Sequence, residues 1–124
     1  MPLYGFHNKL LRIDLVERRV TEELIPDAML RFGLGGKGLA VQLLMKYLPE
    51  GAKPLSADNV LIFVTGPAAD TTVPAASRFG VFAKSPLTGL LGESYSGGHV
   101  APIMKRTGYD AIMLEGVSEE PVYL

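Results

Sequence analysis

The chain contains no cysteine. This absence excludes disulfides, thiolate nucleophiles, cysteine zinc sites and any iron–sulfur cluster bound through cysteines of these 124 residues. The two histidines, His7 and His99, stand far apart in the sequence, whereas a protein metal site usually needs three or more ligands with supporting contacts. We therefore expect no metal bound by side chains of this chain, and any redox metal must be held elsewhere.

The chain also lacks an excess of charge of one sign. Twelve Lys and Arg residues stand against thirteen Asp and Glu, which leaves a net charge of -1 and no electrostatic basis for binding nucleic acid or an anionic membrane. Long hydrophobic runs are absent as well, and the longest, Val60–Val64, is far too short to span a bilayer. The sequence therefore predicts neither a signal peptide nor a membrane span, and we expect a cytoplasmic protein.

Apolar residues, in contrast, are abundant. They make up 48% of the chain while charged residues make up only 20%, which excludes disorder and leaves apolar surface for a partner. A chain of 124 residues has room for one domain, over residues 1–124, that buries roughly two-thirds of the surface it would expose when unfolded. We expect a single folded domain with an interaction surface.

The hydrophobic pattern predicts strands and separate short helices. Alternation over residues 9–24 is typical of a β-hairpin, because successive strand residues face opposite sides. Helical patterns cover residues 27–32, 39–48 and about 99–106, and strand patterns cover residues 60–65, 78–84, 90–94 and 110–115, with a further strand beginning at 121–124. We therefore expect an α+β fold of mixed or antiparallel β-sheets with a few short helices, incomplete at its C-terminal end.

Three glycines, Gly33, Gly35 and Gly38, match the spacing G-x-G-x-x-G. A dinucleotide-binding fingerprint needs a strand directly before the glycines, whereas the preceding residues 27–32 are typical of a helical turn. We therefore favour a glycine connection between two helices over a nucleotide site.

The segment Ser94–Gly98 precedes a predicted helix and is rich in serine and glycine. Such a segment lets backbone N–H groups converge on an anion, with phosphate as the natural ligand, although local pattern alone favours a serine-rich cap and turn. Gly92-Glu93-Ser94 does not match the G-x-S-x-G nucleophile elbow, because Ser96 replaces the second glycine, so a hydrolase has little support.

Arg78 opens an otherwise apolar strand. A guanidinium there is costly unless it reaches solvent or a fixed anion, so two interpretations remain open: an edge residue whose head group is solvated, or an anion ligand.

Six segments in order carry a resemblance that covers essentially the whole chain. They are YGFHNKLLRIDL, LGGKGLA, LIFVTGP, SRFGVFAKSPLTG, SYSGG and GYDAIMLEG. With them the chain resembles the N-terminal domain of the tungsten-containing aldehyde ferredoxin oxidoreductases. Members of that family are much longer, so the resemblance implies the first, cofactor-base part of such an oxidoreductase.

The resemblance implies a molybdopterin-type cofactor: two pyranopterins hold tungsten or molybdenum, and a magnesium ion bridges their phosphates. The implied cofactor-binding residues are Arg78, Tyr95, Ser96, Gly97 and Gly98. The family commonly has asparagine in place of Tyr95, a difference that a contact through the backbone carbonyl would tolerate.

The resemblance further implies that the whole protein oxidises aldehydes to carboxylic acids and passes electrons through a four-iron four-sulfur cluster to ferredoxin. The cluster ligands and the catalytic acid–base residues lie in later domains of the family, so this chain should contain neither and should not be catalytic alone. Its implied partners are the remaining domains, ferredoxin, an aldehyde substrate and a further copy in a homo-oligomer. The alternative is a free-standing binding or assembly module without enzymatic activity.

Overall fold

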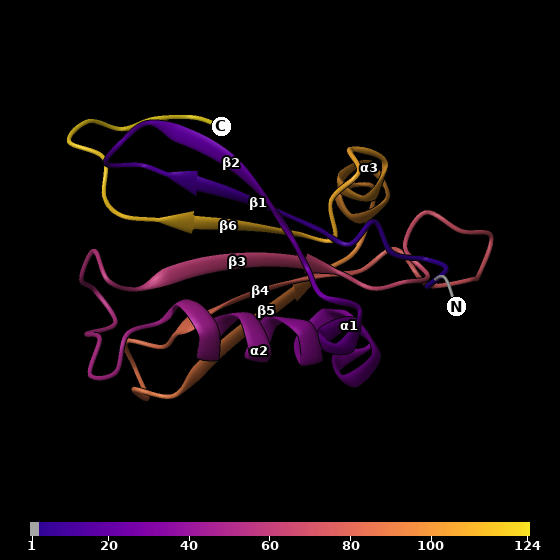
Figure 1. Cartoon of the computed structure of the whole chain (residues 1–124), viewed down its shortest axis with the longest axis horizontal. Coiled ribbons are helices and arrows are strands. Elements are labelled where there is room, and N and C mark those ends of the chain that lie inside the picture. Colours follow the sequence, from indigo (N-terminus) through magenta and orange to yellow (C-terminus); the bar gives the residue numbers. More distant parts are fainter. Residues whose placement is uncertain (1–2) are drawn as a thin grey trace.

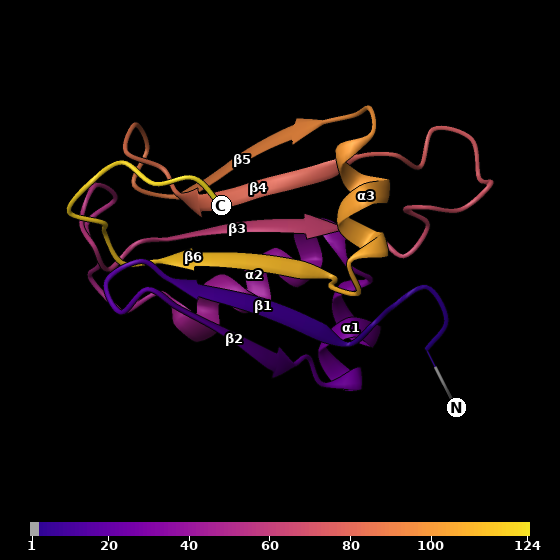
Figure 2. The ribbon, with the colours of Figure 1, turned by 90° about the horizontal axis from the view of Figure 1, so that it is seen from above.

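A computed structural model describes residues 3–124 as one six-stranded β-sheet with three short helices (Figure 1). The elements in chain order are β1 (Lys9–Asp14), β2 (Arg19–Leu24), α1 (Asp27–Gly33), α2 (Gly36–Tyr47), β3 (Val60–Thr65), β4 (Phe79–Lys84), β5 (Leu91–Ser96), α3 (Val100–Arg106) and β6 (Ala111–Glu115). The helices α1 and α2 lie on one face of the sheet, and α3 stands at the end of the other face (Figures 1 and 2). No helix within residues 3–124 is long and apolar enough to cross a membrane.

The strand order across the sheet is β2-β1-β6-β3-β4-β5 (Figure 2). Only β1 and β6 run parallel, and every other neighbouring pair is antiparallel. This arrangement confirms the predicted α+β fold with a mixed sheet. It also confirms the hairpin over residues 9–24 and the strands near residues 60–65, 78–84 and 110–115.

The hydrophobic core lies between the sheet and the two helices beneath it. Alternate strand residues, among them Ile62, Phe82 and Met113, are fully buried, and Leu39 and Leu43 of α2 pack into the same cluster. Complete burial of such side chains stabilises the fold by about 1.5–3 kcal/mol each. The core therefore fixes which face of each strand looks toward the helices and which looks away.

The glycine-rich segment after α1 is a tight connection between two helices. A Cβ on Gly38 would lie 2.2 Å from the carbonyl oxygen of Gly33, so the two glycines permit the close approach of α1 and α2. Leu34, with φ of 54°, ends α1 in the left-handed conformation. The prediction of a helix-to-helix glycine connection is confirmed, because a helix and not a strand precedes the glycines.

Two predicted elements differ from the structure. The strand expected at residues 121–124 is wrong: residues 117–124 are irregular, since the exposed Glu119 and Glu120 precede a proline that lacks a backbone N–H donor. The strand expected at residues 90–94 extends to Ser96, because β4 supplies hydrogen-bonding partners as far as Phe79.

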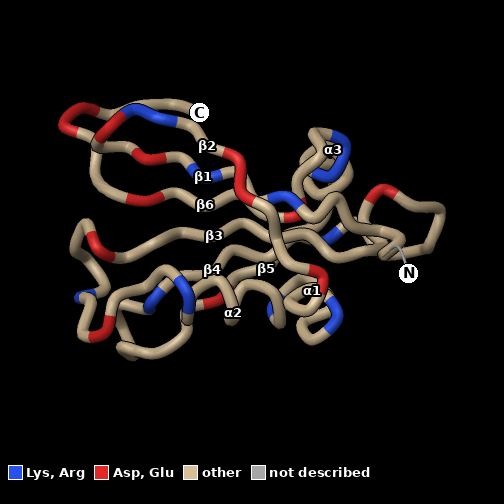
Figure 3. Tube along the Cα trace, in the orientation of Figure 1, with Lys and Arg blue, Asp and Glu red and all other residues tan. Residues whose placement is uncertain are grey.

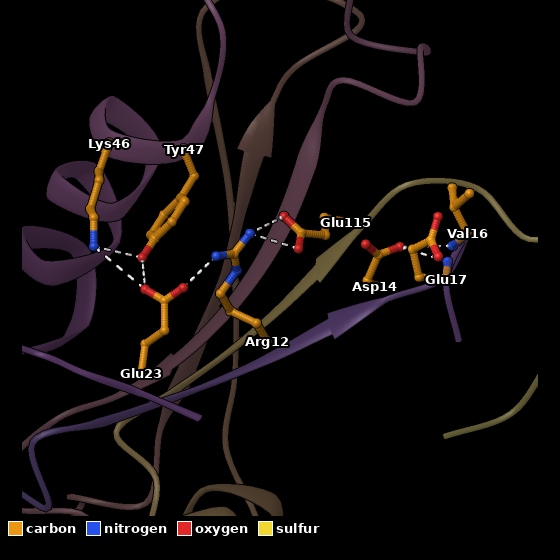
Figure 4. Close-up of polar contacts among 8 residues, drawn as sticks. All are labelled: Arg12, Asp14, Val16, Glu17, Glu23, Lys46, Tyr47 and Glu115. Atoms are coloured by element: carbon orange, nitrogen blue, oxygen red, sulfur yellow. Dashed lines mark hydrogen bonds and ion pairs between the residues drawn. The ribbon is translucent and has the colours of Figure 1, made fainter. Parts of the chain in front are cut away.

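A charged cluster fastens the end of α2 to the sheet (Figure 4). Arg12 of β1 bonds both carboxylate oxygens of Glu115 at 2.7 and 2.8 Å and also donates to Glu23 of β2. Its guanidinium lies 4.8 Å from the ring centre of Tyr47, whose hydroxyl donates to Glu23, and Lys46 lies 3.5 Å from the same carboxylate. The cluster thus joins three strands and one helix. Elsewhere positive and negative side chains are interspersed along the trace (Figure 3).

Candidate functional site

The sheet brings Arg78 and Gly97 together at one corner. The strand β4 begins at Phe79 and β5 ends at Ser96, and these two residues pair across the antiparallel ladder. Arg78 is the residue before β4 and Gly97 is the residue after β5, so the same antiparallel register brings these two residues opposite each other. Two residues that the sequence separates widely are thus neighbours at the same end of the sheet.

The backbone at this corner is open to a ligand. A Cβ on Gly97 or on Gly98 would meet no atom within 4 Å, and Gly98 has a φ of +83° that favours glycine. The strand β5 is an edge strand, because within residues 3–124 it pairs with β4 alone. Its other edge leaves main-chain groups without a strand partner, so a bound molecule can contact them directly.

Arg78 is exposed, and residues 3–124 give it neither a hydrogen bond nor an ion pair. Nearby on β5, Glu93 is already neutralised by Lys37 of α2, whose Nζ lies 2.7 Å from a carboxylate oxygen. The hydrogen bond from Lys37 lowers the pKa of Glu93, so this carboxylate stays ionised and paired. The guanidinium of Arg78 is therefore a cation available to an anionic ligand.

The side chain of Tyr95 faces the helix side of the sheet and is already in use. Its ring packs edge-on against Phe82 with centres 5.7 Å apart, and its hydroxyl lies 3.1 Å from the carboxylate of Glu93. What Tyr95 can offer a ligand at the corner is its main chain. Ser96, one residue further on, belongs to the opposite face of the sheet by strand alternation.

The segment Ser94–Gly98, which the sequence indicates as a candidate anion-binding segment, lies partly in a strand. Ser94, Tyr95 and Ser96 are strand residues, and Gly97, Gly98 and His99 form the connection from β5 to α3. The pattern of small residues could not show this, because whether serine and tyrosine pair as a strand depends on the edge that β4 presents.

A buried ion pair near the same end of the sheet is not apparent from the sequence. Asp110 is fully buried, and its carboxylate accepts hydrogen bonds from Lys105 and from the backbone N–H groups of His7 and Asn8, the latter two at 2.9 and 2.7 Å. The only sequence signal is a charged residue that opens a buried strand, and it does not identify the partner. No group of three or more His, Cys, Asp or Glu residues within residues 3–124 is placed to hold a metal ion.

The fold and the corner define a class: an α+β domain with an open glycine segment beside an arginine that has no partner within residues 3–124. Comparison with known protein families identifies one family. The family model described as "Aldehyde ferredoxin oxidoreductase, N-terminal domain" matches residues 10–124, and this chain belongs to that family.

Similar proteins agree with this assignment. The tungsten-containing aldehyde ferredoxin oxidoreductases of Pyrococcus abyssi and Pyrococcus furiosus are 37% and 38% identical to the chain over 122 residues. A Pyrococcus furiosus protein named as the WOR-like subunit of an aliphatic sulfonate oxidoreductase is 31% identical over 125 residues. Each match covers 98% of this chain but only 20% of the relative.

A solved structure has the same fold. One chain of the active-site complex BamBC of benzoyl coenzyme A reductase, determined with 1,5-dienoyl-CoA, superimposes with a TM-score of 0.94 and 33% identity. The match covers 98% of this chain and 18% of that chain. The chain thus spans about a fifth of the length of the proteins it resembles.

Proposed function

We propose that this chain is the N-terminal cofactor-binding part of a tungsten- or molybdenum-pterin oxidoreductase. The whole protein would oxidise aldehydes to carboxylic acids and pass electrons through a four-iron four-sulfur cluster to ferredoxin in the cytoplasm. One observation carries the proposal: the register of β4 and β5 brings Arg78, whose side chain has no partner within residues 3–124, opposite the open backbone of Gly97. Membership of the aldehyde ferredoxin oxidoreductase family supports a tungsten cofactor as the ligand.

The residues at the corner fit a phosphorylated cofactor. Arg78 would pair with phosphate oxygens, and the N–H groups of Gly97 and Gly98 would donate to the same group without a side chain in the way. Strand alternation turns the carbonyl oxygen of Tyr95 to the free edge of β5, where it would be a hard ligand of the kind that magnesium prefers, whereas Ser96 turns its main chain toward β4. The chain thereby binds and orients the cofactor.

When bound, the cofactor supplies the two-electron redox chemistry, whereas this part of the protein supplies position and charge. No nucleophile or general base is needed from this chain, and the cluster ligands and acid–base residues would lie in the remaining domains. Those domains, ferredoxin, an aldehyde and a second copy of the protein are the proposed partners.

The test is the cofactor content of the intact protein, purified from the cells that encode it and grown with tungstate and molybdate. We expect tungsten or molybdenum, measured by plasma mass spectrometry, in a fixed ratio to protein, together with a pterin that fluoresces after oxidative release. A pure protein that contains neither metal nor pterin would contradict the proposal.

The second candidate function is a free-standing binding or assembly module. It is favoured by an apolar groove of about 400 Å³ between α2 and the β4–β5 hairpin, bordered by the largely exposed Met45 and Leu90. Light scattering coupled to size-exclusion chromatography separates the two candidates. A metal-free protein that self-associates would support the module, whereas a metal-loaded one supports the oxidoreductase.

A further inference from the structure

The helix α3 is attached to the fold by a buried ion pair. Lys105 on this helix is 5% exposed, and its ammonium bonds to the carboxylate of Asp110, which is 0% exposed. The same ammonium lies 5.3 Å from the centre of the Phe6 ring. A buried charge is tolerated only when it is paired and hydrogen-bonded, so each member of this pair requires the other.

Asp110 is also the point at which three segments meet. Its carboxylate accepts the N–H groups of His7 and Asn8, and its backbone carbonyl accepts the N–H of Thr65, at the end of β3, at 3.1 Å. Thr65 is itself buried. The pair therefore couples α3 to the N-terminal segment and to the end of a central strand.

The same helix is linked to the segments that carry both parts of the candidate site. At its N-terminal end, α3 directly follows the connection formed by Gly97, Gly98 and His99. Near its C-terminal end, Arg106 pairs at 2.7 Å with Asp70, in the connection from β3 that leads to Arg78. Figure 2 shows α3 between the end of the sheet and this connection. A displacement of α3 would move Gly97 and Gly98 relative to β4.

We propose that the Lys105–Asp110 pair is a positioning device for the cofactor site. By seating α3, it sets the orientation of the Gly97–Gly98 backbone relative to Arg78, although neither member belongs to the proposed ligand contacts. The inference rests on the proposed function for the identity of the ligand. The seating of α3 by the pair does not depend on that function.

The test uses Lys105→Met, which removes the ammonium but keeps most of the side-chain volume. The exposed Lys53→Met is the matched control for the chemical change. Leu43→Ala in α2, a core substitution away from the corner, is the control for lost stability. The double variant Lys105→Met with Asp110→Asn leaves no unpaired buried charge and serves if the single variant does not fold.

The first measurement is hydrogen exchange in the cofactor-free protein. The N–H of Ile103, which donates to the carbonyl of His99 at 3.2 Å, reports on the first turn of α3. We expect exchange there to rise in Lys105→Met and in the double variant but not in Lys53→Met, and to rise less in Leu43→Ala. Unchanged exchange at α3 in the Lys105 variants would overturn the inference.

The second measurement is the rate at which the loaded protein loses tungsten and pterin during dialysis. Substitution of outer supporting residues commonly weakens a bound group 10–100-fold, so we expect at least about tenfold faster loss in Lys105→Met. Lys105→Arg restores the cation and has room for the larger head group in an adjacent cavity of about 280 Å³, so retention should recover. If Lys105→Met and Leu43→Ala lose the cofactor at rates that depend only on how far each variant lowers the melting temperature, the pair contributes to stability alone and the proposal is contradicted.

The two measurements also separate the two claims. A wild-type protein without metal and pterin contradicts the proposed function and removes the ligand from this inference. Exchange at α3 still decides whether the pair seats the helix.

Discussion

Removal of the Arg12 guanidinium tests how the sheet and α2 are held together. Arg12 lies between Glu23 and Glu115, and the three side chains are 26%, 28% and 24% exposed. Burial alone lowers the pKa of Arg12, but the hydrogen bonds and charges of Glu115 and Glu23 outweigh it and raise the pKa above its ordinary value. The substitution Arg12→Met leaves both carboxylates without this cation.

The expected loss of stability lies between two limits. Loss of one partner from a buried ion pair costs about 3–5 kcal/mol, whereas exposed ion pairs contribute about 0–1 kcal/mol. Since about a quarter of each side chain is exposed, we expect Arg12→Met to lower the free energy of unfolding by about 2–3 kcal/mol at pH 7. Urea denaturation measures this free energy. The control is Lys9→Met: Lys9 and its partner Glu22 are both about half exposed, so this substitution should cost less than about 0.5 kcal/mol.

The pH dependence follows from Glu23. Burial acts to raise the pKa of Glu23, but hydrogen bonds from Tyr47 and Arg12 lower it below the ordinary 4.5. The stabilisation from ionised Glu23 is therefore complete above that ordinary value and disappears as the pH falls through the lower native pKa. In Arg12→Met the carboxylate loses this support, so the stability gap to wild type should narrow in acid. A difference in unfolding free energy between wild type and Arg12→Met below about 0.5 kcal/mol at pH 7, or a difference that grows in acid, would refute the reasoning.

Three further predictions concern the core and the corner. Gly38→Ala should destabilise the protein by about 1–3 kcal/mol in urea denaturation, because the added Cβ would meet the backbone of Gly33 and this clash outweighs the better helix propensity of alanine. The control Gly97→Ala, whose Cβ would meet no atom, should change stability by less than about 0.5 kcal/mol. Phe82→Ala should cost about 3–5 kcal/mol in the same assay, and a smaller loss would place Phe82 outside the core. Tyr95→Asn should lose about 0.5–1.5 kcal/mol of packing against Phe82 but keep the tungsten content, since only its main chain is offered to the cofactor; lost tungsten would contradict that role.

The elements could be predicted where local pattern and neighbours agree. The run Val60–Thr65 is β-branched and aromatic and becomes a buried strand, and Pro102 restricts the start of α3 to the residues just before it. The end of β5 could not be predicted, because Ser96 is a strand residue only through its pairing with Phe79. The irregular residues 121–124 have a strand-like composition, but no neighbouring strand pairs with them.

For the candidate site, too, the sequence indicates residue types but not which residues become neighbours. Arg78 and Gly97 could be selected from the sequence as residue types suited to an anion, but their adjacency follows from the register of β4 and β5, which spacing does not contain. The separate roles of main chain and side chain at Tyr95 follow from its contact with Phe82. The partner of Asp110 could not be chosen, because several lysines are available and only the packing of α3 selects Lys105.

The most direct test of the central claim is the tungsten and pterin content of Arg78→Ala in the intact protein. The exposed Arg19→Ala, on the opposite edge of the sheet, controls for the loss of a guanidinium. With folding verified by circular dichroism, we expect metal and pterin to fall sharply in Arg78→Ala and to stay at the wild-type level in Arg19→Ala. Wild-type metal and pterin in a folded Arg78→Ala protein would contradict the assignment of this corner as the phosphate-binding site.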